Sequence, residues 1–262
     1  MKTIAVVSTA GGTGRTTLTA SLAVLLARRG RQIVALDFDP QNVLGAYLGL
    51  DSLNGPGIAD AILVEGMTDD QDPWQGGTWR NEEGVLFVPY GRRSLDANTR
   101  SEARLAGTPQ WLERALALPD LDDGAAVLID TARYPSQQAD HAIRAADLVL
   151  CVTPPEAVAC ATLVSHLPEL RSAGAQFRVV INRLNPARDM QRDALAMLGA
   201  ALGPGCLLDQ RVHLDAALPE SFGRGTWHFD DAPYSQTAHD LQGLANWLDA
   251  WLSEWDEKGD PR

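Results

Sequence analysis

Cysteine is scarce in this 262-residue chain, which contains three of them. Cys151, Cys160 and Cys206 form no CxxC pair, and we expect buried free thiols in a reducing compartment. The five histidines lack the spacing of metal ligands. The histidines therefore give no reason to expect a histidine-bound metal centre.

Long apolar runs and an excess of basic residues are also missing. No apolar run reaches the length of about 18 residues that would span a membrane, and the N-terminus has no signal-peptide pattern. The formal net charge is −12 and the pI is near 4.8. Because nonspecific DNA binders neutralise phosphates with Lys and Arg, this charge weighs against nucleic acid as a partner, although it leaves room for a local basic patch.

Short apolar segments alternate with helical patterns along the chain. The expected strands are residues 4–8, 33–37, 85–89, 126–130, 148–153 and 177–182. The expected helices are residues 16–29, 108–117, 136–145, 155–173, 188–202 and 235–253. This alternation predicts an α/β fold, with a doubly wound, mostly parallel sheet, helices on both faces and ligands at the carboxyl ends of the strands.

We expect one domain over residues 1–255. Residues 54–83 are rich in Gly, Asp and Trp, and we interpret them as an irregular insertion with one short helix near residues 58–64. Residues 256–262 are expected to form a flexible tail.

A glycine-rich loop over residues 8–17 lies between the first strand and the first helix. Glycines let backbone N–H groups turn toward an anion, and the helix N-terminus adds positive potential. Thr16 stands where a P-loop hydroxyl would hold Mg²⁺, whereas Thr9 and Arg15 replace the Gly and Lys of the strict G-x-x-x-x-G-K-[ST] pattern. The predicted nucleotide-binding residues here are Gly11, Gly12, Thr13, Gly14, Arg15, Thr16 and Thr17.

Carboxylates end two of the expected strands. Asp37 and Asp39 are spaced so that their side chains point the same way, so Asp37 can hold the metal through water and Asp39 can orient a water on the γ-phosphate. The alternative is a solvated turn. Asp130 ends an apolar strand as a Walker B carboxylate does, and it joins Thr16 and Asp37 as a predicted metal ligand.

Asn182 and Arg183 end a later strand. The Asn amide can pair with the adenine edge, and Arg can stack on the ring. The alternative is an ordinary polar strand end.

The C-terminal helical segment has an amphipathic pattern. Its apolar positions are Leu241, Leu244, Trp247, Leu248, Trp251 and Trp255. The opposite side is acidic, whereas a membrane-surface helix would carry Lys and Arg there. We expect this face to pack on the core, with a partner groove for Trp251 and Trp255 as the alternative.

Four of these segments follow one another over nearly the whole chain: residues 11–17, Asp37-x-Asp39-Pro40-Gln41, Ile129-Asp130-Thr131 and Asn182-Arg183. The ordered set resembles the MinD/ParA class of deviant P-loop ATPases. Residues 39–44 (Asp-Pro-Gln-Asn-x-Leu), 88–91 (Val-Pro-Tyr-Gly), 235–241 and 244–247 are similar to the cellulose-secretion branch of that class, the BcsQ (YhjQ) type.

The resemblance implies ATP or ADP with Mg²⁺ as cofactors and an ATP-sandwich homodimer. It also implies a cytoplasmic protein that partners recruit to the inner membrane, where it would assemble with other cellulose-secretion subunits and act in assembly or placement of the synthase.

Three departures from the class bear on catalysis. Ala10 stands where the class has a signature lysine that reaches the partner's phosphates, and Arg15 replaces the second lysine. Arg15 keeps the positive charge in a broader, planar group, so we expect Asp39 and Arg15 to act in any chemistry. Arg133 follows the Walker B segment, where the class usually has D-x-P-x-G, and is a candidate for the missing cation.

The sequence is compatible with four functions. The first is a slow ATPase or nucleotide-dependent dimer for cellulose secretion, and the second is a scaffold that binds nucleotide without catalysis. A third is a DNA- or pole-associated partition ATPase, which the net charge disfavours. A fourth is a dinucleotide enzyme that uses Gly12, Gly14 and Asp37, but Thr17 stands where its third glycine would be.

Overall fold

The computed structural model describes residues 1–64, 74, 76–117, 121–122, 124–172 and 174–258. Within them, eight strands form one sheet in the order β3-β4-β2-β5-β1-β6-β7-β8. Neighbouring strands are parallel except for β3, which is antiparallel to β4. The strands are β1 (Lys2–Val7), β2 (Ile33–Phe38), β3 (Trp79–Arg80), β4 (Leu86–Val88), β5 (Ala126–Thr131), β6 (Leu148–Thr153), β7 (Gln176–Leu184) and β8 (Leu207–His213).

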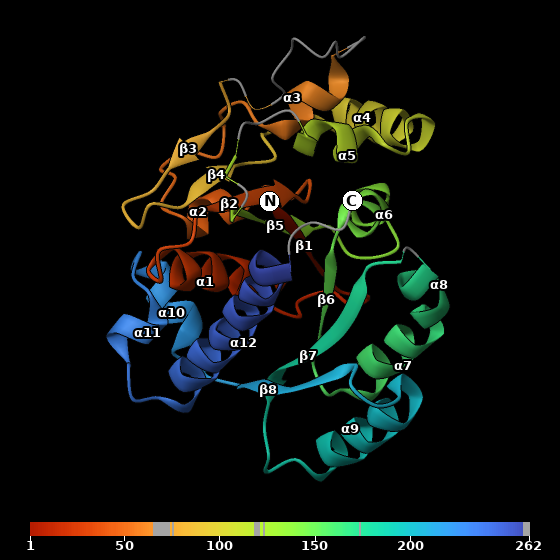
Figure 1. Cartoon of the computed structure of the whole chain (residues 1–262), viewed down its shortest axis with the longest axis vertical. Coiled ribbons are helices and arrows are strands. Elements are labelled where there is room, and N and C mark those ends of the chain that lie inside the picture. Colours follow the sequence, from red (N-terminus) through yellow and green to blue (C-terminus); the bar gives the residue numbers. More distant parts are fainter. Residues whose placement is uncertain (65–73, 75, 118–120, 123, 173, 259–262) are drawn as a thin grey trace.

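Helices cover both faces of the sheet (Figure 1). One face packs against α1 (Arg15–Ala27), α2 (Leu44–Tyr47), α10 (Leu218–Gly223), α11 (His228–Asp231) and α12 (Gln236–Lys258). The other packs against α3 (Ile58–Leu63), α4 (Leu95–Gly107), α5 (Trp111–Ala117), α6 (Gln137–Ala145), α7 (Ala157–Ser165), α8 (Leu167–Ser172) and α9 (Asp189–Leu202). The predicted doubly wound α/β fold is therefore confirmed.

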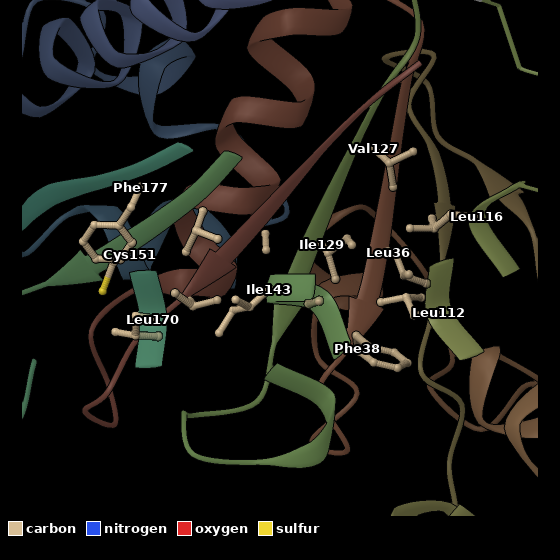
Figure 2. Close-up of a cluster of buried hydrophobic side chains, with 14 of the residues drawn as sticks. Leu36, Phe38, Leu112, Leu116, Val127, Ile129, Ile143, Cys151, Leu170 and Phe177 are labelled. Carbon is tan, nitrogen blue, oxygen red and sulfur yellow. The ribbon is translucent and has the colours of Figure 1, made fainter. Parts of the chain in front are cut away.

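The strands alternate between two apolar cores because successive side chains point to opposite faces. In β1, Ile4 and Val6 belong to the core under α1 and α12, whereas Ala5 and Val7 belong to the core under α6. Figure 2 shows this second core, where Leu36 of β2 lies beside Leu112 of α5. Burial on both faces explains why the central strands are apolar at nearly every position.

The last helix packs against the first (Figure 1). Leu241, Leu244 and Leu248 are fully buried and Trp251 nearly so, in the core that α1 also lines. The expected core packing is confirmed for these residues, whereas the side chain of Trp255 lies outside the described set. Arg31, in the loop between α1 and β2, donates to Asp249 of α12 at 2.7 Å and ties this loop to the last helix.

Several elements differ from the predicted ones. The expected helix over 155–173 is split into α7 and α8, because Pro168 lacks the N–H that would continue the helical ladder. The strands β3 and β8 and the helices α2, α4, α10 and α11 were not predicted. Cys206 is half-buried rather than buried, and its sulfur accepts a hydrogen bond from Arg171 at 3.0 Å.

Within residues 54–83, the described part contains α3 and β3. Residues 65–73 and 75 of the expected insertion lie outside the described set, as do residues 259–262 of the expected tail, while α12 continues to Lys258. In the described part of the chain, no helix combines the length and apolar character needed to cross a membrane.

Candidate functional site

The glycine-rich loop connects the carboxyl end of β1 to the first turn of α1. Gly12 and Gly14 have φ angles of 66° and 93°, which lie in the left-handed region that favours glycine. Gly14 also borders the Asn182 side chain closely: a Cβ at this position would lie 2.3 Å from Asn182 Nδ2. Both glycines therefore let the loop curve before the helix begins.

Asn182 and Arg183 brace this loop from the end of β7. Asn182 Nδ2 donates to the Thr13 carbonyl at 2.7 Å, and Arg183 Nη1 donates to the Gly12 carbonyl at 2.9 Å. Arg183 itself has a φ of 60°. These contacts place both residues at the loop, a role that the sequence did not predict, and the contact with adenine stays a prediction.

Thr16 and Asp130 meet beneath the loop. Thr16 Oγ1 donates to Asp130 Oδ2 at 2.6 Å. Asp130 is fully buried, and its Oδ1 has no hydrogen-bond partner among the described residues. Burial raises the pKa of Asp130 to about 7, and the hydrogen bond from Thr16 opposes that rise. An oxygen acceptor is thus left free beside a hydroxyl.

Asp37 lies next to Asp130 in the sheet, as the paired position on β2. Its Oδ1 accepts the N–H of Asp39 at 3.1 Å and its Oδ2 accepts the N–H of Leu44 at 3.0 Å. Burial, and then the charge of Asp130, hold the pKa of Asp37 well above its usual range. Asp37 therefore organises the turn from β2 to α2, and its metal role stays a prediction.

Asp39 and Arg15 face each other in the wall of the site, and both side chains are mostly buried. Asp39 Oδ1 accepts the N–H of Gln41 at 2.9 Å, and Asp39 Oδ2 lies 3.6 Å from Arg15 Nη2. Burial raises the pKa of Asp39, while the Gln41 N–H and the Arg15 charge lower it. Arg15 Nη1 donates to the Ala10 carbonyl at 3.3 Å.

A cavity of about 770 Å³ opens over these groups, within the size range of small-molecule sites. It is lined by Gly11, Gly12, Thr13, Gly14, Arg15, Thr16, Thr17, Asp39, Pro40, Gln41, Val43, Tyr47, Ala132 and Arg133. The whole predicted phosphate loop therefore faces one space together with Asp39 and the exposed Arg133. Tyr47 of α2 was missed, because no local pattern marks it as a lining residue.

The side chains fit a hard divalent cation only in part. Among the described residues, no cluster of three or more His, Cys, Asp or Glu side chains could hold a metal. The Thr16 hydroxyl and the free Oδ1 of Asp130 offer two oxygen sites. Mg²⁺ is commonly held by one or two carboxylates, phosphate oxygens and water, so the donor set suits Mg²⁺ that arrives with a phosphate ligand.

Sequence comparisons point to the same family. The family model described as "Cellulose biosynthesis protein BcsQ" matches residues 1–248. An uncharacterised ATP-binding protein of Methanocaldococcus jannaschii is 29% identical over 185 residues, which cover 70% of this chain and 64% of that protein. The cellulose biosynthesis protein BcsQ of Escherichia coli K12 is 29% identical over 124 residues, which cover 47% of this chain and 43% of that protein. Each match spans less than two thirds of the relative's length.

Solved structures share the fold. The cell division ATPase MinD of Pyrococcus furiosus has a TM-score of 0.74 and 25% identity, and the match covers 95% of this chain and 99% of that one. MinD of Pyrococcus horikoshii, determined with Mg-ADP, has a TM-score of 0.75 and 23% identity, and the match covers 95% of this chain and 96% of that one. With a family match over residues 1–248 and this fold, the chain belongs to the BcsQ family of MinD/ParA-type ATPases.

Proposed function

We propose that this chain binds ATP or ADP with Mg²⁺ on the loop of residues 11–17. With ATP it forms a homodimer, hydrolyses the nucleotide slowly and supports assembly or placement of a bacterial cellulose synthase secretion complex. The relatives named for cellulose biosynthesis and for ATP binding support the pathway and the ligand.

The contact between Thr16 and Asp130 carries the proposal. It joins the first turn of α1 to the end of β5 at 2.6 Å, directly under a glycine-rich loop, and it leaves one carboxylate oxygen free in a buried place. A buried polar atom without a partner is costly unless a ligand or ion completes it. A cation carried by a nucleotide phosphate would do so.

Each residue then has a distinct task. The loop N–H groups and Arg15 would bind phosphate oxygens, and Thr16 and Asp130 would hold Mg²⁺. Mg²⁺, when bound, neutralises the charge that develops on the phosphate oxygens. Asp39 would orient the attacking water, while Asn182 and Arg183 keep the loop in shape through its carbonyls.

Calorimetry on Thr16→Val tests the site. The substitution removes the hydroxyl but keeps the volume, so we expect Mg²⁺-dependent ATP affinity to fall about tenfold or more, the scale of a lost charged hydrogen bond. Thr162→Val on α7 is a matched control, because Thr162 is half-buried and its hydroxyl donates to the Val158 carbonyl within its own helix. Equal affinity in Thr16→Val and wild type would contradict the assignment.

Exposed apolar side chains near the site support the dimer. Val158 and Met190 are 80% and 69% exposed, in the first turns of α7 and α9, and Leu95 begins α4 at 84% exposure. These helices follow the carboxyl ends of the parallel strands β4, β6 and β7. The glycine-rich loop of residues 11–17 lies at the same edge of the sheet, after β1. An edge of this kind suits a second copy of the chain placed across the nucleotide.

Turnover is expected to be slow because position 10 is alanine. An absent cation at the developing charge can cost about 10³–10⁵ in rate, by analogy with arginine fingers. We expect Ala10→Lys to speed single-turnover ATP hydrolysis. If Ala10→Lys changes nothing and wild type already turns over rapidly, another group supplies the charge, and Arg133 is the first to test.

A non-catalytic nucleotide scaffold is the second candidate. The absence of a lysine at position 10 and the pairing of Asp39 with Arg15 favour it. A single-turnover rate for wild type equal to that of Asp39→Ala would establish it in place of an ATPase.

The cellulose role has its own test. We expect the protein to act in the cytoplasm, to be recruited to the inner membrane through partner subunits, and to be needed for cellulose output. Deletion in the native host should abolish or mislocalise cellulose secretion, measured by dye binding, and the Thr16→Val protein should fail to restore it. Normal secretion after deletion would contradict this role.

A further inference from the structure

Arg15 and Asp39 form a mostly buried ion pair inside the nucleotide cavity. Arg15 Nη2 lies 3.6 Å from Asp39 Oδ2, and the two side chains are 11% and 9% exposed. Arg15 begins α1, and Asp39 follows β2. The pair therefore joins the phosphate loop to the turn that carries the proposed water-orienting carboxylate.

The Arg15 guanidinium uses few of its donors. Of its five N–H groups, one makes a long bond of 3.3 Å to the Ala10 carbonyl. Its Nε is buried and has no hydrogen-bond partner in the described part of the chain. A guanidinium binds phosphate oxygens through two parallel N–H groups, so these free donors suit a phosphate in the same cavity.

The two oxygens of Asp39 have different surroundings. Oδ1 accepts the N–H of Gln41 at 2.9 Å, a contact within the turn that Asp39 begins. Oδ2 faces Arg15. The position of Oδ2 thus depends on a partner that a phosphate can take away.

We propose that Arg15 is a positioning residue that holds Asp39 in the nucleotide-free protein and releases it when a nucleotide phosphate takes the guanidinium. This inference rests on the proposed function, because it requires a nucleotide phosphate at the loop. Phosphate and carboxylate then compete for one cation, and Asp39 becomes free to orient water after the phosphate has bound.

A double-mutant cycle on nucleotide affinity tests the competition. Calorimetry with Mg²⁺ and a non-hydrolysable ATP analogue is run on wild type, Arg15→Ala, Asp39→Ala and the double variant. When Arg15 is present, we expect Asp39→Ala to raise nucleotide affinity. When Arg15 is replaced by alanine, the same substitution should raise affinity by a factor that is smaller by about threefold or more, which is the scale of coupling between contacting charges. Simple repulsion between Asp39 and phosphate would instead give an equal or larger gain without Arg15, which would overturn the inference.

A second readout uses the protein without nucleotide. The shifts in unfolding midpoint caused by Arg15→Ala and Asp39→Ala should be non-additive, because each removes the same ion pair; additive shifts would overturn the inference. Arg15→Lys keeps the charge and should restore part of this coupling, which Arg15→Ala loses altogether.

The pair of Lys2 and Asp147 is a matched control. It is 3.1 Å long, its side chains are 16% and 14% exposed, and it lies at the amino end of β1, away from the loop. Lys2→Ala and Asp147→Ala, singly and together, should leave nucleotide affinity unchanged. If wild type itself fails to bind the Mg²⁺ analogue, the proposed function and this inference both fall. If wild type binds but the cycle is additive, this inference alone falls.

Discussion

At the scale of single residues, Asp130 is a fully buried carboxylate with one oxygen that has no partner among the described residues, at the site where Mg²⁺ is proposed to bind. A buried carboxylate is stable in its charged form when cations or several donors face it. In the described structure Thr16 donates one hydrogen bond, Oδ1 has no partner, and burial raises the pKa of Asp130 to about 7. The residue that would hold Mg²⁺ therefore lowers stability when Mg²⁺ is absent.

We expect Asp130→Asn to stabilise the free protein at pH 8. The folded pKa of about 7 lies above the ordinary value of 3.8, so folded Asp130 keeps its proton longer than unfolded Asp130, and stability falls as the pH rises through this window. Because asparagine carries no charge, the variant should have a free energy of unfolding about 1–3 kcal/mol higher than wild type at pH 8, and the difference should be smaller at pH 5. Urea unfolding at both pH values measures the gain.

The same variant should lose Mg²⁺-dependent nucleotide affinity. Asp147→Asn is a control, because its carboxylate accepts bonds from Lys2 and from the Thr3 N–H and should lose stability on neutralisation. An Asp130→Asn protein that is less stable than wild type at pH 8 would contradict the cost assigned to this carboxylate.

Gly14→Ala should disrupt the phosphate loop. The φ of 93° and the Asn182 amide 2.3 Å from the new Cβ together disfavour alanine, and strain of this kind costs about 1–3 kcal/mol. We expect lower thermal stability and weaker nucleotide binding.

Gly11→Ala is the matched loop control, since its Cβ would meet nothing within 4 Å. The melting temperature of Gly11→Ala should be close to that of the wild-type protein. Equal melting of Gly14→Ala and Gly11→Ala would show that the contact with Asn182 carries no strain.

At the scale of elements, α12 closes the core beside α1. The leucines of α12 recur on one face, and α1 supplies Leu18, Leu22 and Leu25 to the same core. The pattern in the sequence predicted this helix because its apolar stripe is wide. By contrast α4 buries Ala97, Ser101 and Leu105, which are mostly small or polar, so its sequence carries a weak apolar signal.

Leu244→Ala should destabilise the fold by about 2–5 kcal/mol, because it opens a cavity at a fully buried site. Leu95→Ala, at a site that is 84% exposed, should change stability by less than about 0.5 kcal/mol. Denaturant titration of both variants checks the difference. Similar small losses in both would mean that α12 is not part of the core.

At the scale of the whole molecule, the parallel sheet brings the loops after β1, β2, β5 and β7 to one edge. The phosphate loop, Asp39, Asp130 and Asn182 each follow or end one of these strands. Exposed apolar residues in the first turns of neighbouring helices lie at the same edge, and this arrangement underlies the proposed dimer.

Val158→Glu and Met190→Glu should prevent ATP-dependent dimerisation, because they place charges on the apolar edge. Light scattering after size-exclusion chromatography, with Mg²⁺ and a non-hydrolysable ATP analogue, measures the effect. Nucleotide affinity of the monomer should stay within about twofold, since neither residue lines the cavity.

Met197→Glu is the control for a charge placed elsewhere. Met197 is 45% exposed and lies in the middle of α9, away from the strand ends. The Met197→Glu variant should form the ATP-dependent dimer as the wild-type protein does. Unimpaired dimers in Val158→Glu would place the dimer surface elsewhere on the molecule.

Local sequence patterns determined much of this protein. Apolar runs predicted the central strands, because these strands are buried on both faces. The glycine spacing and the strand-end carboxylates predicted a curved loop with acidic neighbours, and phosphate binding by that loop stays a prediction. The edge strands β3 and β8 escaped prediction, since β3 has two exposed residues and β8 mixes polar with apolar positions.

The tertiary structure alone decided which of these residues meet. Arg15 and Asp39 lie on different strand-helix units, and Asn182 contacts Thr13 across most of the chain. Such contacts depend on the strand order and on the exact turn after each strand, which arise from packing the whole sheet rather than from local propensity. For that reason the sequence indicated a phosphate site, while the folded chain determined that Arg15 pairs with Asp39.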